Sequence, residues 1–268
     1  LRDSVISHAK ELNYLPRSFT SASVKVNITI TSQDTQKKSI LVPKGTQFIS
    51  RVGDSSYSFS TNENIVATSN VVSASQNQFY LENVIIYEGN YLSDTYVVDY
   101  NQPLIYKINN PQVDISSITV RSLEDNGSST IIYTRATSLF GLDELSKVFF
   151  VQPAINGTYE IVFGDGIIGR RPKNGSVILA EYRICNGELP NGATKFFTAG
   201  KIDQESNVAI STVIAANNGS VAETLDSIKF NAPRAFTTQE RAVTAEDYQN
   251  LLLLYYPEIN TVIACLLY

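Results

Sequence analysis

Alternation of apolar and polar residues with a period of two runs through most of this chain and is the feature that most restricts its fold. In residues 24–31, VKVNITIT, every second residue is valine or isoleucine, and the residues between them are polar. Such a pattern is typical of a strand with one face in the core and the other in water. Short β-branched and aromatic runs recur to about residue 214. The sequence therefore predicts a mainly β protein.

Asn-Gly pairs separate many of these runs. The six pairs begin at Asn126, Asn156, Asn174, Asn186, Asn191 and Asn218. Asparagine and glycine tolerate the positive φ angles that tight hairpin turns require. We therefore expect antiparallel β structure, arranged as several β domains or sandwiches.

Two segments have helical periodicity instead. Residues 3–13 place Val5, Ile6, Ala9 and Leu12 on one side of a helix that Asp3 could cap. In residues 244–256, Thr244 and Asp247 are spaced like a capping box, and Pro257 ends the helix at Tyr256. The predicted class is mainly β with minor α (α+β). It has a short N-terminal helix and a C-terminal α/β module, in which a strand at residues 261–265 follows the second helix.

These patterns divide the chain into four expected parts. They are an N-terminal helical segment (1–22), a β domain (23–100), a β domain with an FGDG hairpin (101–216) and a C-terminal helix-containing module (217–268). The last boundary rests on a change of composition at residues 217–220, where a helical pattern begins. Because the chain starts at leucine and stops within the final expected strand, we expect a part of a longer protein with its last module truncated.

The second helix is apolar on nearly every side. Such a helix must be buried on more than one side. Three interpretations remain open: burial within a larger C-terminal domain, contact with another subunit, or a ligand groove. The candidate subunit-interface residues are Tyr248, Leu251, Leu252, Leu253, Leu254, Tyr255 and Tyr256.

Charge and hydropathy argue against two classes of partner. The formal net charge of −5 provides no basic surface for a nucleic-acid backbone. The one dense basic stretch, residues 170–173, contains a proline and precedes an Asn-Gly pair, which is typical of a solvated turn. No apolar stretch reaches the 18 or more residues of a membrane span. We expect neither nucleic acid nor membrane as a partner.

The residues that usually carry catalysis are scarce. His8 is the one histidine, so a nucleophile activated by imidazole or a histidine-rich metal site is not expected. Cys185 and Cys265 lack Cys-x-x-Cys spacing and are expected to be small buried apolar residues. The sequence predicts no enzyme activity, no cofactor, no metal and no small-molecule substrate.

Residues 164–169, GDGIIG, could be mistaken for a phosphate or calcium loop. A phosphate loop requires a following helix with Lys-Ser/Thr, whereas residues 167–173 lead through a proline toward another strand. Calcium requires several oxygen ligands, and Asp165 is the only carboxylate in the turn. We expect a structural turn in which Asp165 accepts hydrogen bonds from backbone amides. Its residues are Gly164, Asp165, Gly166 and Gly169.

Residues 159–192 resemble a segment of the baseplate J-like family, the wedge subunits of contractile phage tails and related injection machines. The matching positions are Phe163, Gly164, Asp165, Gly166, Gly169, Pro172, Gly175, Ile178, Tyr182, Arg183 and Gly187. Two further matches flank this segment in the expected order: VPKGTQF (42–48) with YSFST (57–61), and APRAFTTQERAVTAEDY (232–248). The overall sequence pattern resembles that of the large wedge proteins of T-even-type phages.

The resemblance implies a structural virion protein of the tail baseplate, assembled in the host cytoplasm. Copies would pair as a homodimer or larger assembly and would bind other baseplate wedge proteins. The resemblance carries no catalytic residues to this sequence. The alternative is a tail or surface adhesin whose β domains bind carbohydrate or a receptor, which would require a cleft with exposed aromatic side chains.

Overall fold

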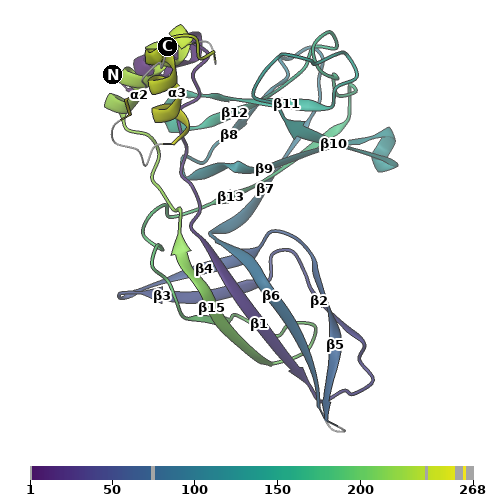
Figure 1. Ribbon diagram of the computed structural model, residues 1–268. Coiled ribbons are helices and arrows are strands. Elements are labelled where there is room, and N and C mark those ends of the chain that lie inside the picture. The colour runs from purple at the N-terminus through teal and green to yellow at the C-terminus, as the bar shows by residue number, and fades with distance from the viewer. Residues whose placement is uncertain (1, 74–75, 239–240, 257–261, 264–268) are drawn as a thin grey trace.

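The computed structural model of this chain describes residues 2–73, 76–238, 241–256 and 262–263. Within these residues, two β-sheets lie one above the other in Figure 1, and helices lie beside the upper sheet. The helices are α1 (Arg2–Glu11), α2 (Leu225–Thr238) and α3 (Ala245–Tyr255). The predicted mainly β class, with a short N-terminal helix and C-terminal helices, is confirmed.

The first sheet is antiparallel and has the order β14-β3-β4-β6-β1-β15, with β5 joining β2 to β6. Its strands are β1 (Ser23–Ser32), β2 (Ser39–Val42), β3 (Gln47–Val52), β4 (Ser55–Thr61), β5 (Ile65–Ser73), β6 (Gln76–Glu88), β14 (Phe196–Thr198) and β15 (Asn207–Asn217). The alternation predicted for residues 24–31 is confirmed, because Val24, Val26, Ile28 and Ile30 are all buried. They pack with Phe48, Phe59 and Phe79.

The second sheet has the order β7-β13-β9-β10-β11-β12-β8. Its strands are β7 (Asn90–Val97), β8 (Ile105–Ile108), β9 (Val113–Glu124), β10 (Ser129–Arg135), β11 (Val148–Pro153), β12 (Tyr159–Phe163) and β13 (Val177–Ile184). All its pairs are antiparallel except β10 with β11. Tyr96 on β7 donates its hydroxyl to the carbonyl of Lys107 on β8 at 2.9 Å, so the two end strands of the sheet meet. The sheet is therefore strongly curved around one core.

The predicted apolar face of the N-terminal helix is confirmed. Ile6 and Ala9 of α1 are buried against Ile228 and Ala232 of α2, and Val5 and Leu12 pack beside them. Asp3 lies inside α1 instead of capping it, and its carboxylate accepts a hydrogen bond from the Asn156 backbone at 3.0 Å.

Helix α3 has the capping box predicted at its start. The Thr244 hydroxyl accepts a hydrogen bond from the Asp247 backbone, and the Asp247 carboxylate accepts one from the Thr244 backbone. The helix ends at the predicted place, with Tyr256 as its cap. The strand expected at residues 261–265 lies outside the described residues, apart from Val262 and Ile263.

The two sheets divide the chain differently from the expected ranges. Strand β7 falls in the range 23–100 but belongs to the second sheet, while β14 and β15 fall in 101–216 and belong to the first. The FGDG segment is not the hairpin expected, because β12 pairs with β8 and β11 whereas β13 pairs with β7 and β9. Of the six Asn-Gly pairs, those at Asn126 and Asn156 join adjacent antiparallel strands. Local pattern locates strands, but long-range pairing decides which strands are neighbours.

A single residue, Gly89, joins the first sheet to the second between β6 and β7. Its φ angle is +108°, a conformation open to glycine but costly for other residues. A Cβ atom at this position would lie 2.1 Å from the carbonyl oxygen of Ile184 on β13. The close approach of the two backbones therefore requires glycine here.

Replacing Gly89 by alanine should lower the free energy of unfolding by at least about 3 kcal/mol, since strain and a backbone clash combine. Gly45→Ala is the matched control, because Gly45 also has a positive φ (+83°) but no atom lies within 4 Å of an added Cβ. We expect the control to cost about 1 kcal/mol. Urea unfolding followed by circular dichroism measures both, and equal losses for the two variants would contradict the close-approach argument.

Candidate functional site

Residues with catalytic potential are dispersed over the described part of the chain. No three His, Cys, Asp or Glu side chains within it form a group that could hold a metal ion. His8 is exposed and lies 3.4 Å from the Glu11 carboxylate in the same helix. Cys185 is buried, and this burial raises the pKa of its thiol to about 11, whereas Cys265 lies outside the described residues. No described helix has both the length and the apolar character needed to cross a membrane.

Backbone groups of the turn at residues 164–169 hold most of it, and the Gly169 amide also donates to the Asp143 carbonyl at 2.8 Å. The Asp165 carboxylate accepts hydrogen bonds from the amides of Ile167 (2.9 Å) and Ile168 (3.1 Å), and these bonds hold its pKa below the usual value. Gly166 and Gly169 have φ angles of +92° and +85°. At Gly164, a Cβ would lie 2.4 Å from two carbonyl oxygens of the same turn. The geometry fits a local structural element.

The basic stretch that follows this turn is largely neutralised within the chain. The Arg170 guanidinium lies 2.8 Å from the buried Glu124 carboxylate, and Lys173 lies 3.1 Å from that of Asp125. Arg171 stacks on the ring of Tyr100, 3.6 Å from its centroid. Glu124 and Asp125 anchor the loop between β12 and β13 to the β9–β10 hairpin, and Tyr100 ties it to the segment between β7 and β8.

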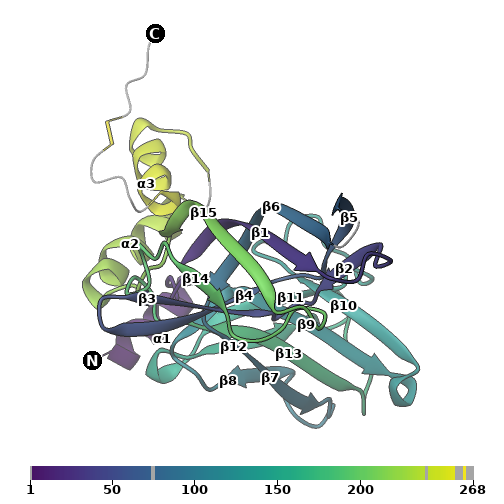
Figure 2. The same ribbon diagram turned by 90° about the horizontal axis from the view of Figure 1, so that it is seen from below.

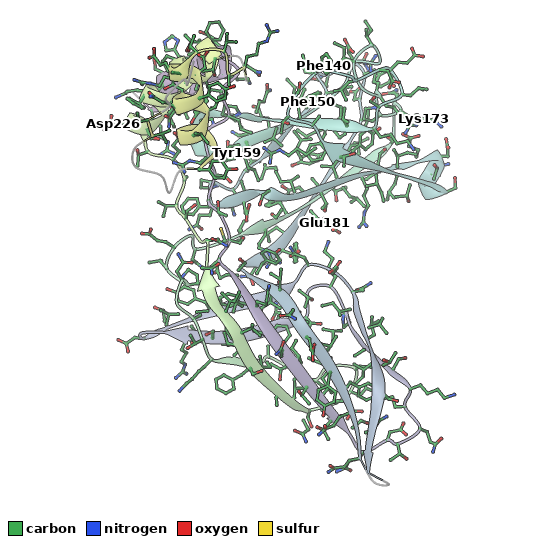
Figure 3. The ribbon with its side chains drawn as sticks, viewed as in Figure 1. Phe140, Phe150, Tyr159, Lys173, Glu181 and Asp226 are labelled. Carbon is green, nitrogen blue, oxygen red and sulfur yellow. The ribbon has the colours of Figure 1, made fainter. Side chains whose placement is uncertain are left out.

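The most unusual buried group is Arg183 on β13, which is 1% exposed. Alternation along β13 directs Ile178, Ala180 and Tyr182 into the core of the second sheet, so Arg183 projects from the opposite face. Glu181 shares that face with Arg183, and in Figure 3 it lies between the two sheets. There it binds Lys44 of the first sheet at 3.1 Å. The first sheet therefore covers the face of β13 that carries Arg183.

Four acceptors surround the Arg183 guanidinium, and all come from the first sheet or the residues that leave it. Nη1 donates to the Ser60 hydroxyl at 2.7 Å and to the carbonyls of Tyr87 and Gly89 at 3.0 Å each. Nη2 donates to Asn62 Oδ1 at 2.6 Å, and the guanidinium also stacks on the Tyr91 ring. Among the described residues, no carboxylate lies within ion-pair distance of Arg183, so neutral acceptors alone bind this buried cation directly.

Buried carboxylates hold the connecting segments at the junction between the two sheets, where Arg183 also lies. Glu88 accepts both the backbone and side-chain amides of Asn186, and burial raises its pKa, with the charge of Arg183 acting in the opposite direction. Asp114 on β9 accepts the Ser21 amide at 2.9 Å, just before β1 begins. Each chain crossing between the sheets is thus held by at least one buried polar group.

Glu223 joins the helices to the segment that precedes β1 through hydrogen bonds of the same kind. Its carboxylate accepts the Tyr14 hydroxyl at 2.9 Å, the Arg17 amide at 3.1 Å and the Ser227 hydroxyl at 2.6 Å. These bonds join the end of α1 to the start of α2. Because Glu223 is buried, its position is fixed by these partners.

Helix α3 leaves part of its apolar side exposed. Tyr248, Leu252 and Tyr256 are exposed, and Leu251 is half-buried. The side chains of Leu253, Leu254 and Tyr255 lie outside the described part of the structure. Two further exposed aromatic residues, Phe230 and Phe236, lie on the neighbouring helix α2. Sequence periodicity identified the α3 residues but not these two.

Sequence reasoning placed Arg183 in a family pattern without giving it a role. The available signal was an arginine in a β13 run whose only other charged residue is Glu181, since a charged residue within a buried strand requires partners. The partners themselves were not recognisable, because they are small polar groups and carbonyls about 90 to 120 residues away.

Removing the guanidinium should destabilise the protein by at least about 3 kcal/mol, because four acceptors, among them the buried Ser60 hydroxyl and Gly89 carbonyl, then lose their donor. We expect this loss for Arg183→Met, and Arg183→Lys should recover only part of it, since an ammonium cannot span the same acceptors. Arg121→Met is the matched control, because the exposed ion pair of Arg121 with Glu181 contributes little. Urea unfolding measures all three variants. A loss below about 1 kcal/mol for Arg183→Met would contradict the argument that the Arg183 guanidinium holds the two sheets together.

The sequence of this chain matches known baseplate proteins. Residues 21–89 match the family model described as baseplate wedge protein gp6, domain II. This match covers β1 to β6 and ends at Gly89, the residue at which the chain passes to the second sheet.

A longer alignment extends the likeness. The baseplate wedge protein gp6 of Enterobacteria phage T4 is 26% identical over 280 aligned residues, which cover 94% of this chain and 40% of that protein. The chain thus spans less than half the length of this relative. The cryo-EM structure of the anti-feeding prophage baseplate contains a chain with a TM-score of 0.37 and 13% identity, covering 97% of this chain and 47% of that one. A structural likeness of this size decides neither fold nor function. These sequence matches confirm the resemblance inferred from the sequence, and the chain is similar to baseplate wedge protein gp6.

Proposed function

We propose that this chain is a structural part of a wedge subunit in the baseplate of a contractile phage tail. The observation that carries the proposal is the alignment with a baseplate wedge protein along 94% of the chain. The protein would work by holding binding surfaces in a fixed arrangement, without enzyme activity or a cofactor. The buried polar junction between the two sheets supports such a role, because it opposes independent movement of the sheets.

Self-association through the C-terminal helices is the finer part of the proposal. Tyr248, Leu252 and Tyr256 of α3 expose apolar surface, and Phe230 and Phe236 of α2 add to it. Exposed apolar residues gathered on neighbouring elements are typical of protein-protein contacts. A second copy would cover this surface, and other wedge proteins would bind elsewhere on the chain.

The adhesin alternative would require a cleft with exposed aromatic side chains among the described residues. The hollow found among them has a volume of about 340 Å³ and is lined by Pro43, Thr46, Gln47, Ala199, Gly200, Lys201, Ile202 and Asp203. It contains no aromatic side chain on which a sugar ring could stack.

Antibodies raised against this chain should label the baseplate end of intact phage tails in negative-stain electron microscopy. The expected location follows from the proposed wedge role. Antibodies against the tail tube provide the control for accessibility. Label confined to fibre tips would instead favour the adhesin, and particles that lack the chain in mass spectrometry would contradict both functions.

Light scattering on the purified chain should give the mass of a dimer or larger assembly at micromolar concentration. Leu252→Lys should shift the mass toward that of a monomer, because the charge would be buried in the proposed contact. Val66→Lys is the matched control, since Val66 is an exposed residue on β5, in the first sheet. An unchanged mass for Leu252→Lys, or a monomeric parent, would remove α3 as the site of self-association.

A further inference from the structure

Strand β15 has an edge that is only partly covered. Within the described residues it pairs with β1 and with no second strand, and Figure 2 shows it along the outside of the first sheet. Residues 192–194 cover its C-terminal half: Gly192 and Ala193 exchange backbone bonds with Ala216, and the Thr212 hydroxyl donates to the Thr194 carbonyl. The edge of residues 207–211 has no corresponding cover.

This edge lacks the usual protection against strand pairing. Exposed edges are ordinarily short, charged, interrupted by proline or bent by a bulge. The described sheet ends β14, β2 and β8 have three or four residues each, and β7 carries Asp94. Strand β15 has eleven residues, NVAISTVIAAN, without a charge or a proline. Its register irregularities with β1 all lie beyond Thr212.

The core of the first sheet is also open on this side. Ile28 and Ile30 of β1 are 1% and 0% exposed, because strands flank them on both sides. Their partners on β15, Ile210 and Val208, face the same core but are only partly buried. A further strand beside residues 207–211 would cover both side chains.

We propose that residues 207–211 of β15 accept an extended segment of another protein, which adds a strand to the first sheet. The segment would be uncharged and would carry an apolar residue at every second position, next to Val208 and Ile210. Backbone hydrogen bonds would supply most of its affinity, and the two apolar contacts would set its register. The proposal rests on the wedge function above, since the assembly supplies the partner.

A second copy of this chain fits the edge less well. If β15 paired antiparallel with itself about Ala209, residue 213 of one copy would face residue 205 of the other. The cover at residues 192–194 would then meet the turn formed by Ile202 and Glu205, which pair backbone to backbone. That turn carries Asp203 and Glu205, both bound to Lys37. A separate segment of about five residues avoids this collision.

Hydrogen-deuterium exchange, measured on the isolated chain and on baseplates assembled with it, tests the proposal. Amides of residues 207–211 that point away from β1 should exchange at least about tenfold more slowly in the assembled baseplate. Val208→Lys, which places a charge where the added strand would pack, should reduce incorporation about tenfold. Val213→Lys in the covered half should incorporate normally. Thermal unfolding of both variants establishes that each is folded.

The outcomes separate the two proposals. If the chain enters baseplates while residues 207–211 exchange as fast as in the isolated chain, the strand-addition proposal is overturned and the wedge function stands. Slow exchange already present in a dimer of the isolated chain would identify a second copy as the occupant and overturn the separate partner. A folded chain that never enters baseplates would overturn both proposals.

Discussion

Burial of the Arg183 guanidinium is the constraint on which the arrangement of this molecule depends. Removing such a group from water costs several kcal/mol unless each donor finds an acceptor. Arg183 belongs to the second sheet, yet its acceptors are Ser60, Asn62 and the carbonyls of Tyr87 and Gly89, from the first sheet or residues that leave it. The cation is therefore satisfied only when both sheets are folded and correctly placed. Gly89 makes the same demand sterically, because its backbone lies against Ile184.

A fixed junction gives the exposed surfaces of the chain a defined geometry. Glu223 holds α1 and α2 together through Tyr14 and Ser227, and α3 follows them with exposed tyrosine and leucine side chains. The β15 edge belongs to the first sheet and lies across the junction from the core of the second sheet. A structural subunit must keep its contacts at set distances, and a buried polar clamp does this because few alternative arrangements satisfy the same groups.

Features that depend on neighbouring residues were predictable. The alternation at residues 24–31 predicted β1, the spacing of Val5, Ile6, Ala9 and Leu12 predicted the buried face of α1, and Thr244 with Asp247 predicted the start of α3. Asp165 lies among backbone amides only two and three residues away, so its surroundings are also local. The family resemblance came from glycines and aromatic residues at fixed spacing, which require no knowledge of pairing. The hairpin expected after Phe163 was wrong, because β12 and β13 are sequential but not adjacent.

The sequence by itself determined the strands and the helices with their caps and apolar faces, since each depends on residues close together in the chain, and it determined the family likeness through residue types at fixed spacing. Tertiary structure alone decided which sheet each strand joined, and it placed β14 and β15 beside residues about 150 or more positions earlier. It also decided that Arg183 is buried while Val208 and Ile210 remain half-exposed. Whether a residue is buried depends on what packs against it. Arg183 is buried because residues of a distant strand pack around it, whereas Val208 and Ile210 are half-exposed because no strand among the described residues lies beyond β15.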